Sequence, residues 1–152
     1  MRKWLAFALA WALILGGSFL AHRVQTAQGP GRTWASPVKV SEVRIPAGQG
    51  VTISGLLYVP ATATARTRAP AVLASHGYIN TREMQSSFAI ELSRRGFVVL
   101  AMDMTGHGYS GGIVGTADFG GPAALRYLRS LPFVDAGRIG LEGHSVGGGP
   151  IL

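Results

Sequence analysis

Apolar and polar residues follow different patterns in successive parts of the chain. The first part is an apolar stretch from Trp4 to Leu20, in which only the glycines and Ser18 are not strongly apolar. It follows Arg2 and Lys3 directly. As an α-helix it would be about 26 Å long at 1.5 Å per residue, which is the short end of a bilayer span. We therefore expect residues 4–20 to contact a membrane.

Two interpretations of this stretch compete, an uncleaved anchor and a cleaved signal peptide. The apolar core of a signal peptide usually has about 7–15 residues and is followed by a small-residue cleavage site. Here the core is longer, and the only candidate site, at 26–29, is weak. This favours a membrane anchor over residues 1–21, with secretion after cleavage as the alternative. Arg2 and Lys3 favour a cytoplasmic N-terminus, so we expect the body of the protein outside the cytoplasm.

A linker and a hairpin are predicted next. Residues 22–37 mix Gln, Gly, Pro and Thr, a composition typical of a tether. From residue 38 apolar positions alternate with polar ones, which predicts strands over 38–45 and 51–59. The segment 46–50 begins with proline and ends with glycine, and it is the expected turn between them.

The remaining segments alternate between short apolar runs and helical periodicity. Met84, Phe88 and Leu92 recur at helical spacing, and Asn80 with Glu83 resembles a capping box ahead of them. In chain order we expect a strand at 71–75, this helix, a strand at 97–102, a helix at 122–131 and a strand at 138–142. Such alternation predicts an α/β fold, with a mostly parallel sheet and flanking helices.

Composition and charge exclude several classes of function. The chain has 152 residues, no cysteine and a net charge of +7. Without cysteine there are no disulfides, cysteine-based zinc sites or thiol nucleophiles. Four basic residues and no acid lie in residues 1–36, and the basic residues after them are scattered without a basic run among aromatics. We therefore expect no nucleic-acid binding.

The last predicted strand runs into Gly143-His144-Ser145-Val146-Gly147, a G-x-S-x-G motif. Between a strand and a helix, this motif makes a sharp turn that exposes the serine hydroxyl at the carboxyl end of a sheet. Side chains at the two glycines would crowd the neighbouring strand and helix. The start of the following helix supplies free backbone N–H groups. Ser145 is therefore the candidate nucleophile.

Two further motifs precede this one. His76-Gly77-Tyr78 follows the third predicted strand, and residues 103–110 have the form D-x-x-G-x-G-x-S after the fourth. The three motifs share their order and approximate spacing with α/β-hydrolases. On these motifs, residues 38–152 resemble the N-terminal portion of an α/β-hydrolase domain.

The resemblance implies a serine hydrolase and assigns roles around the nucleophile. Ser145 would be catalytic, and the backbone N–H groups of Tyr78 and Val146 would form the oxyanion hole. The glycines implied in the two turns are Gly77, Gly143 and Gly147. The implied substrate is a small-molecule carboxylic ester, with an amide or peptide less favoured. No cofactor and no metal is implied.

The family places an acid and then a histidine after the nucleophile. Only seven residues follow Ser145, and none of them is acidic or a histidine. The chain therefore resembles an incomplete hydrolase, with five of the roughly eight strands that the family implies. We expect these 152 residues alone to be nearly inactive, because no base is available to the nucleophile. We also expect poor solubility, because the last strand would have an open edge.

The histidines and acids within the chain do not provide the missing triad members. His144 adjoins Ser145, but a neighbour in a sharp turn points elsewhere. His76 is expected to make structural hydrogen bonds beside the oxyanion turn, and Asp103 to organise the loop that it begins. Glu142 is expected to pack, or to pair with an arginine.

Two other functions stay open. Gly106, Gly108 and Gly111 match the G-x-G-x-x-G fingerprint of dinucleotide-binding enzymes and follow a strand. That motif leads directly into a helix, whereas residues 112–121 predict more loop. A non-catalytic α/β-hydrolase-like protein would keep the serine turn but lack the distal acid and histidine. No H-E-x-x-H or comparable ligand spacing supports a metal site.

Overall fold

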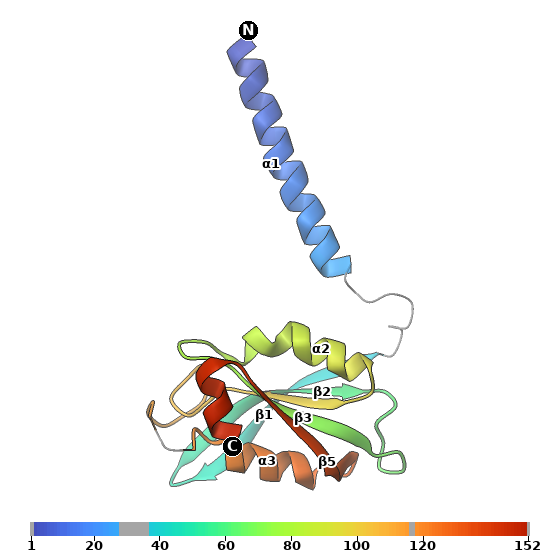
Figure 1. Ribbon diagram of the computed structural model, residues 1–152, viewed down its shortest axis with the longest axis vertical. Helices are drawn as coiled ribbons and strands as arrows, with labels where there is room; N and C mark the ends of the chain where they lie inside the picture. The colour runs from blue at the N-terminus through green and yellow to red at the C-terminus, as the bar shows by residue number, and fades with distance from the viewer. Residues whose placement is uncertain (1, 28–36, 116–117, 152) are drawn as a thin grey trace. The chain divides into compact units, whose positions relative to one another are not determined.

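The computed structural model describes residues 2–27, 37–115 and 118–151 (Figure 1). The chain divides into two units, Met1–Ala35 and Ser36–Leu152, which are described separately. The elements in chain order, with η for a 3₁₀ helix, are α1 (Arg2–Ala27), β1 (Val38–Gly48), β2 (Val51–Pro60), β3 (Ala69–Ser75), η2 (Arg82–Gln85), α2 (Ser86–Arg94), β4 (Val98–Met102), α3 (Gly121–Ser130), β5 (Val134–Gly143) and η3 (Ser145–Ile151).

The first unit contains the helix α1. Its window Lys3–Leu20 is long and apolar enough to cross a membrane, and its side chains are exposed on all sides. A signal sequence has the same properties, so both interpretations of this stretch stay open. The helix continues to Ala27, so the expected tether does not begin at residue 22. Residues 22–27 contain neither glycine nor proline to end the helix. The remainder of the expected tether, 28–36, lies outside the described residues.

The second unit is built on a five-stranded sheet in the order β1-β2-β4-β3-β5. Strands β4, β3 and β5 run parallel, as the alternation of strands and helices predicts. The mostly parallel sheet expected from the sequence is confirmed. Among the described strands β2 alone runs in the opposite direction, because it pairs antiparallel with both β1 and β4. The sheet is mixed, since the hairpin brings β2 beside β4 in the opposite direction.

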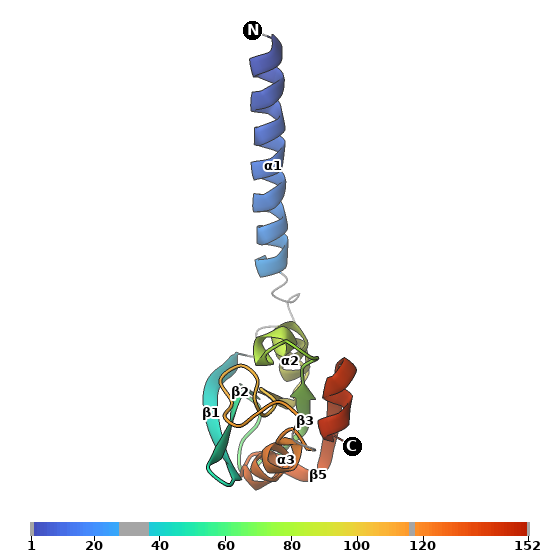
Figure 2. The same ribbon diagram turned by 90° about the vertical axis from the view of Figure 1, so that its left-hand side faces the viewer.

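Helices cover both faces of this sheet, α2 on one face and α3 on the other (Figures 1 and 2). Successive side chains of a strand point to opposite faces, so each strand contributes to two cores. Leu73 packs in the core that contains Leu128 of α3. Its neighbour Val72 packs in the core that contains Ala89 of α2. The α/β architecture expected from the sequence is therefore confirmed.

The helix expected near residue 84 starts differently from the prediction. The chain enters it through the 3₁₀ turn η2, whose N-cap is Thr81 without a side-chain capping bond. The predicted capping box of Asn80 and Glu83 is therefore wrong. The Glu83 carboxylate instead accepts a hydrogen bond from Arg82 Nε at 3.0 Å.

The buried face of α2 also differs from its most apolar face. Ala89 and Ser93 are fully buried, and the Ser93 hydroxyl donates to the Tyr58 carbonyl at 3.3 Å. Met84 and Phe88 are exposed. Small residues let the helix approach the sheet closely, and this close approach leaves the larger side chains at the flank.

The strand predicted at 138–142 is confirmed, and it extends in both directions to Val134 and Gly143. Among the described strands, β5 pairs with β3 alone and forms an edge of the sheet. On this edge strand Leu141 is 45% exposed. The structure therefore leaves a row of backbone groups and an apolar side chain open to other molecules.

We predict that a polypeptide of residues 37–152 self-associates through β5, because an unpaired strand edge is a template for further pairing. Leu141→Lys should weaken this association, since a charge on an edge strand opposes pairing. Analytical ultracentrifugation over a concentration series measures the effect. Val40→Lys is the matched control, because Val40 is also 45% exposed but lies on β1, an edge that already carries charged residues. A cooperative melt of a monomeric polypeptide would contradict the prediction.

Candidate active site

The turn between β5 and η3 presents Ser145 at the carboxyl end of a parallel strand. The strand ends at Gly143, and Ser145 is the first residue of η3. Ser145 has a φ of +55°, a left-handed conformation that residues other than glycine rarely adopt, and it is exposed. An exposed serine on a strained backbone after an extended strand is the local geometry expected of the G-x-S-x-G motif.

Close backbone contacts require the two glycines of this motif. A Cβ at Gly143 would lie within 3.0 Å of the Gly147 carbonyl. A Cβ at Gly147 would lie equally close to the carbonyl oxygens of Ser75 and His76, where β3 ends. Real Cβ atoms do not make such contacts, so any side chain would force the turn away from β3.

The segment after the turn is a 3₁₀ helix rather than an α-helix. The Gly147 N–H donates to the His144 carbonyl at 2.9 Å, which closes the first 3₁₀ turn. Three consecutive glycines and Pro150 follow Val146. Glycine is a poor helix former, and proline lacks the N–H that would extend an α-helical ladder. The sequence of this segment therefore opposes a regular α-helix.

The two N–H groups expected to hold an oxyanion lie in adjacent turns. Ser75 of β3 is paired with Gly143 of β5, so the turns after these two strands begin side by side. Tyr78 belongs to the first turn and Val146 to the second. Within the part of the chain that the structure describes, neither N–H donates a hydrogen bond to the protein. Both donors are therefore free for a ligand.

His144 joins these two turns. Its backbone N–H donates to the Ser75 carbonyl at 3.1 Å. Its Nδ1 would lie 2.7 Å from a Cβ at Gly77, so only glycine fits beside it with this ring position. Among the described residues the Ser145 hydroxyl has no hydrogen-bond partner, and so His144 does not contact it as a base. This agrees with the expectation that His144 points elsewhere.

His76 is fully buried and makes structural hydrogen bonds beside the oxyanion turn, as expected. Its Nε2 accepts the Met104 N–H at 3.1 Å, and its Nδ1 lies 2.7 Å from the Gly77 carbonyl oxygen. Burial lowers the pKa of His76, although the Gly77 carbonyl and the Asp103 carboxylate act in the opposite direction. The imidazole is therefore neutral at pH 7.

Asp103 organises the loop that it begins, as expected from its place at the end of β4. The residue is fully buried, and its carboxylate accepts the N–H groups of Arg82 at 2.7 Å and Tyr109 at 3.0 Å. The Ser110 hydroxyl donates to the Asp103 carbonyl at 2.8 Å. It also accepts the Ser54 N–H at 2.8 Å, which joins the loop to β2.

Arg82 is a residue that the sequence analysis missed. Its side chain is only 3% exposed, and its Cζ lies 4.9 Å from the centre of the Tyr109 ring. Burial acts to lower the pKa of Arg82, but hydrogen bonds to carboxylates outweigh burial and raise it. In the sequence, Asp103 indicates that such a residue exists, because an acid directly after a fully apolar strand requires a partner. The side-chain hydrogen bonds of Arg82 run from Nη2 to Glu42 Oε1 (2.7 Å), from Nε to Glu83 Oε1 (3.0 Å), and from Nη1 to Ser54 Oγ (2.5 Å) and the Gly55 carbonyl (3.2 Å).

The glycines of the possible dinucleotide fingerprint pack against their own chain. A Cβ at Gly108 would lie within 3.0 Å of the Asp103 carboxylate, and a Cβ at Gly106 equally close to the Val114 nitrogen. In a dinucleotide site such glycines leave space for a pyrophosphate and open a helix. Here the protein fills that space, and α3 begins only at Gly121. The geometry argues against dinucleotide binding.

Glu142 was expected to pack or to pair with an arginine, and among the described residues no arginine pairs with it. Its Oε2 is buried and has no hydrogen-bond partner among the described residues. Burial raises the pKa of Glu142, and the nearby His144 partly offsets this shift. With Met84 and Phe88, these two residues line a cavity of about 250 Å³ on the α2 side of the sheet. The cavity reaches the oxyanion turn at Gly77.

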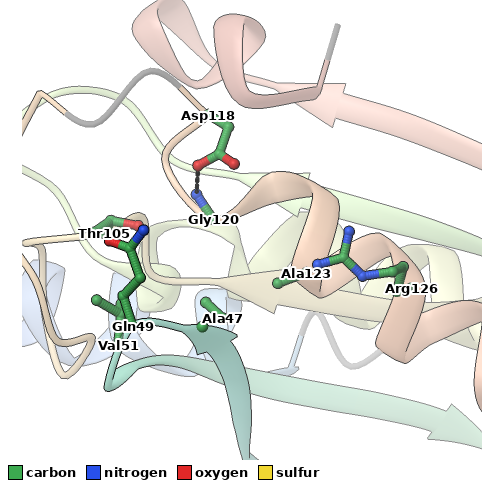
Figure 3. A pocket seen from close by; sticks show the side chains of 9 residues that line it. Ala47, Gln49, Val51, Thr105, Asp118, Gly120, Ala123 and Arg126 are labelled. Atoms are coloured by element: carbon green, nitrogen blue, oxygen red, sulfur yellow. Dashed lines mark hydrogen bonds between the residues drawn. The ribbon is translucent and has the colours of Figure 1, made fainter.

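A cavity of about 360 Å³ lies between the β1–β2 hairpin and the start of α3 (Figure 3). Its lining includes Asp118, whose carboxylate accepts the Gly120 N–H at 3.0 Å, and Arg126. Ser145 is not among its lining residues. Across the described ranges, no group of three His, Cys, Asp or Glu side chains is arranged to hold a metal ion.

Comparisons with known proteins match the fold of the chain and part of its sequence. A family model described as serine aminopeptidase, S33, matches residues 66–121, which include the turn after β3 and the loop after β4. A hypothetical protein from Pseudomonas aeruginosa has a TM-score of 0.61 and 28% identity, over 73% of this chain and 37% of its own. A hyperthermophilic esterase from the archaeon Pyrobaculum calidifontis has a TM-score of 0.58 and 25% identity, over 77% and 38%. The fold of the described second unit is therefore similar to that of esterases and other hydrolases with an α/β-hydrolase fold.

Another solved structure similar to this chain is Est1E from Butyrivibrio proteoclasticus with bound ferulic acid. Its TM-score is 0.62 and its identity 26%, over 70% of this chain and 43% of Est1E. The chain thus spans between 37% and 43% of the lengths of these three proteins. Among curated proteins, none matches the chain significantly.

We predict that Gly147→Ala destabilises this α/β-hydrolase unit by about 1–3 kcal/mol, because the added Cβ meets the carbonyl oxygens at the end of β3. Gly148→Ala is the matched control, since a Cβ there has no neighbour within 4 Å. It should leave stability unchanged or raise it by up to about 1 kcal/mol. Urea unfolding of the full chain in detergent micelles, followed by circular dichroism, measures both. Equal stability of the two variants would contradict the contact.

We also predict that Arg82→Met destabilises the unit by about 3–5 kcal/mol, because it leaves the Asp103 carboxylate buried without its cation. Arg95→Met is the control, since Arg95 is 64% exposed and pairs with Glu91 on the surface of α2. Its loss should change stability little. The same urea unfolding experiment measures both variants. An Arg82 variant as stable as the Arg95 variant would show that the buried network does not hold the fold.

Proposed function

We propose that this chain carries the nucleophile of a serine hydrolase that acts on small-molecule carboxylic esters, with amides or peptides less favoured. The observation that carries the proposal is the exposed Ser145 at a φ of +55°, in a turn between β5 and η3. The similarity to an esterase, and to Est1E with a bound carboxylic acid, supports this class of substrate. We infer the identity of the nucleophile from the geometry of the turn.

The reaction begins when the Ser145 hydroxyl attacks the carbonyl carbon of the ester. Negative charge develops on the carbonyl oxygen, and the N–H groups of Tyr78 and Val146 stabilise it by about 3 kcal/mol each. The tetrahedral intermediate collapses to an acyl-serine and releases the alcohol, which takes up the proton that the serine gave to a base. Water then attacks the acyl carbonyl carbon and gives a proton to the base. The bond between this carbon and the Ser145 oxygen breaks, the carboxylic acid leaves, and the base returns the proton to Ser145.

In this proposal the acid and the histidine of the triad come from residues outside these 152. Among the described residues near the turn, His144 and Glu142 make no hydrogen bond to the Ser145 hydroxyl, and His76 and Asp103 are already engaged. Both ring nitrogens of His76 have partners, and both oxygens of Asp103 accept backbone N–H groups. The chain covers less than half of the length of the similar structures, and this supports the same proposal. In this proposal the active enzyme is an extended polypeptide, which contains this chain and further residues that supply the acid and the histidine.

We further propose that residues 4–20 anchor the hydrolase in a membrane, with the catalytic unit outside the cytoplasm. The length and apolar surface of α1 support an anchor, and the basic residues before it support the orientation. Removal as a signal peptide would instead release the hydrolase. A non-catalytic binding protein of the same fold is the second candidate function, because the Ser145 hydroxyl has no base among the described residues.

We predict that Ser145→Ala lowers kcat/KM of the extended polypeptide for p-nitrophenyl butyrate by at least about 10³-fold, because the nucleophile is lost. Ser87→Ala, an exposed serine of α2, is the control and should keep full activity. The release of p-nitrophenol measures both variants.

The 152-residue chain alone should react with a fluorophosphonate probe only at background rate, since no base activates the serine. Stoichiometric labelling of Ser145 in that chain would refute the need for residues outside it. Undiminished hydrolysis by the Ser145→Ala extended polypeptide would refute the proposed nucleophile and favour another site.

A further inference from the structure

The Tyr78 N–H belongs to the same peptide group as the Gly77 carbonyl. In a trans peptide the carbonyl and the N–H point in opposite directions, and the described peptide bonds contain no cis form. A group that fixes the Gly77 carbonyl therefore also fixes the direction of the Tyr78 N–H. Two groups lie on this carbonyl oxygen: His76 Nδ1 at 2.7 Å and the Asn80 N–H at 3.2 Å.

The second ring nitrogen of His76 decides how its bond to Gly77 is made. The Met104 N–H donates to His76 Nε2 at 3.1 Å, so Nε2 presents a lone pair and carries no proton. A neutral imidazole then carries its proton on Nδ1, which donates to the Gly77 carbonyl. Complete burial of the ring favours this neutral form. The Met104 N–H, just after β4, thus selects the His76 tautomer that donates to the turn after β3.

The surroundings hold the His76 ring in place. The ring centre lies 5.3 Å from that of His107, and the His107 ring meets the Tyr78 ring edge to face at 5.9 Å. The Asp103 carboxylate lies 4.0 Å from Nε2. Each of these neighbours belongs to one of the two loops that follow β3 and β4. Rotation of the ring would therefore disturb both loops.

The turn after β3 needs such restraint because its backbone is strained. Ile79 has a φ of +60° and is 84% exposed. This left-handed conformation is unfavourable for a β-branched residue, and no burial of the Ile79 side chain offsets its cost. The two hydrogen bonds to the Gly77 carbonyl keep the turn closed against this strain.

We propose that His76 is a positioning residue that locks the Gly77–Tyr78 peptide. The Nδ1–H tautomer holds the carbonyl inward, so that the Tyr78 N–H points outward and stays free for an oxyanion. The catalytic consequence rests on the proposed function, whereas the lock itself rests on the hydrogen bonds alone. The two parts can therefore be tested separately.

The lock is tested first by NMR on the full chain in detergent micelles, labelled with ¹⁵N and ¹³C. Long-range ¹⁵N–¹H spectra should show His76 protonated on Nδ1 and unprotonated on Nε2. A scalar coupling across the hydrogen bond should join Nδ1 to the Gly77 carbonyl carbon. A proton on Nε2, or the absence of this coupling, overturns the inference whatever Ser145 does.

The catalytic consequence is tested with two matched variants of the extended polypeptide. In His76→Asn the amide nitrogen takes the place of Nδ1 and still donates to Gly77. In His76→Gln the longer side chain reaches the place of Nε2 and leaves the Gly77 carbonyl without that donor. We expect His76→Asn to keep kcat within a few fold, and His76→Gln to lower it about 10²-fold with little change in KM.

Both variants lose the same ring, so a general loss of packing affects them alike. Equal kcat values for the two folded variants would overturn the positioning role. If neither variant folds, the proposal is tested by the His76 tautomer and by the coupling from Nδ1 to the Gly77 carbonyl carbon, both measured in the unaltered chain. Undiminished hydrolysis by Ser145→Ala would remove the proposed function but leave the NMR test of the lock intact.

Discussion

One buried negative charge, the Asp103 carboxylate, holds together the parts of the fold on which the proposed site depends. A buried carboxylate is stable only when hydrogen bonds and a cation surround it. Here the N–H groups of Arg82 and Tyr109 bind it, and the Arg82 guanidinium nitrogen Nε lies 3.8 Å away. Arg82 in turn contacts β1 and β2. Because η2 follows the turn of Tyr78, the bond from the Arg82 N–H to this carboxylate also fixes where the oxyanion turn ends.

The features that the sequence predicts well are those set by short-range rules. Alternation of apolar residues gives the strands, and the two cores follow from the alternation of Leu73 and Val72 along β3. The serine turn is also local, because glycines on both sides of Ser145 after a strand leave the chain few other conformations. The sharp turn and the exposure of Ser145 therefore follow from the local sequence.

The features that the sequence does not predict depend on distant partners. The helical spacing of Met84 and Phe88 suggests a buried face, yet the distance between α2 and the sheet selects Ala89 and Ser93 instead. No periodicity marks Arg82, because its role arises from groups on β1, β2 and the loop after β4. The place of β2 beside β4 is another case, since it depends on pairing between segments far apart in the sequence.

The residues of the serine turn are under two kinds of selection, one for folding and one for reactivity. The contact between Gly147 and the end of β3 shows the first kind. Both glycines of the turn are demanded by folding, whether or not the molecule reacts with anything. Serine at 145 is different, because its hydroxyl has no partner among the described residues and its backbone angle suits glycine better. In a related protein that no longer catalyses a reaction, we expect position 145 to be substituted before either glycine.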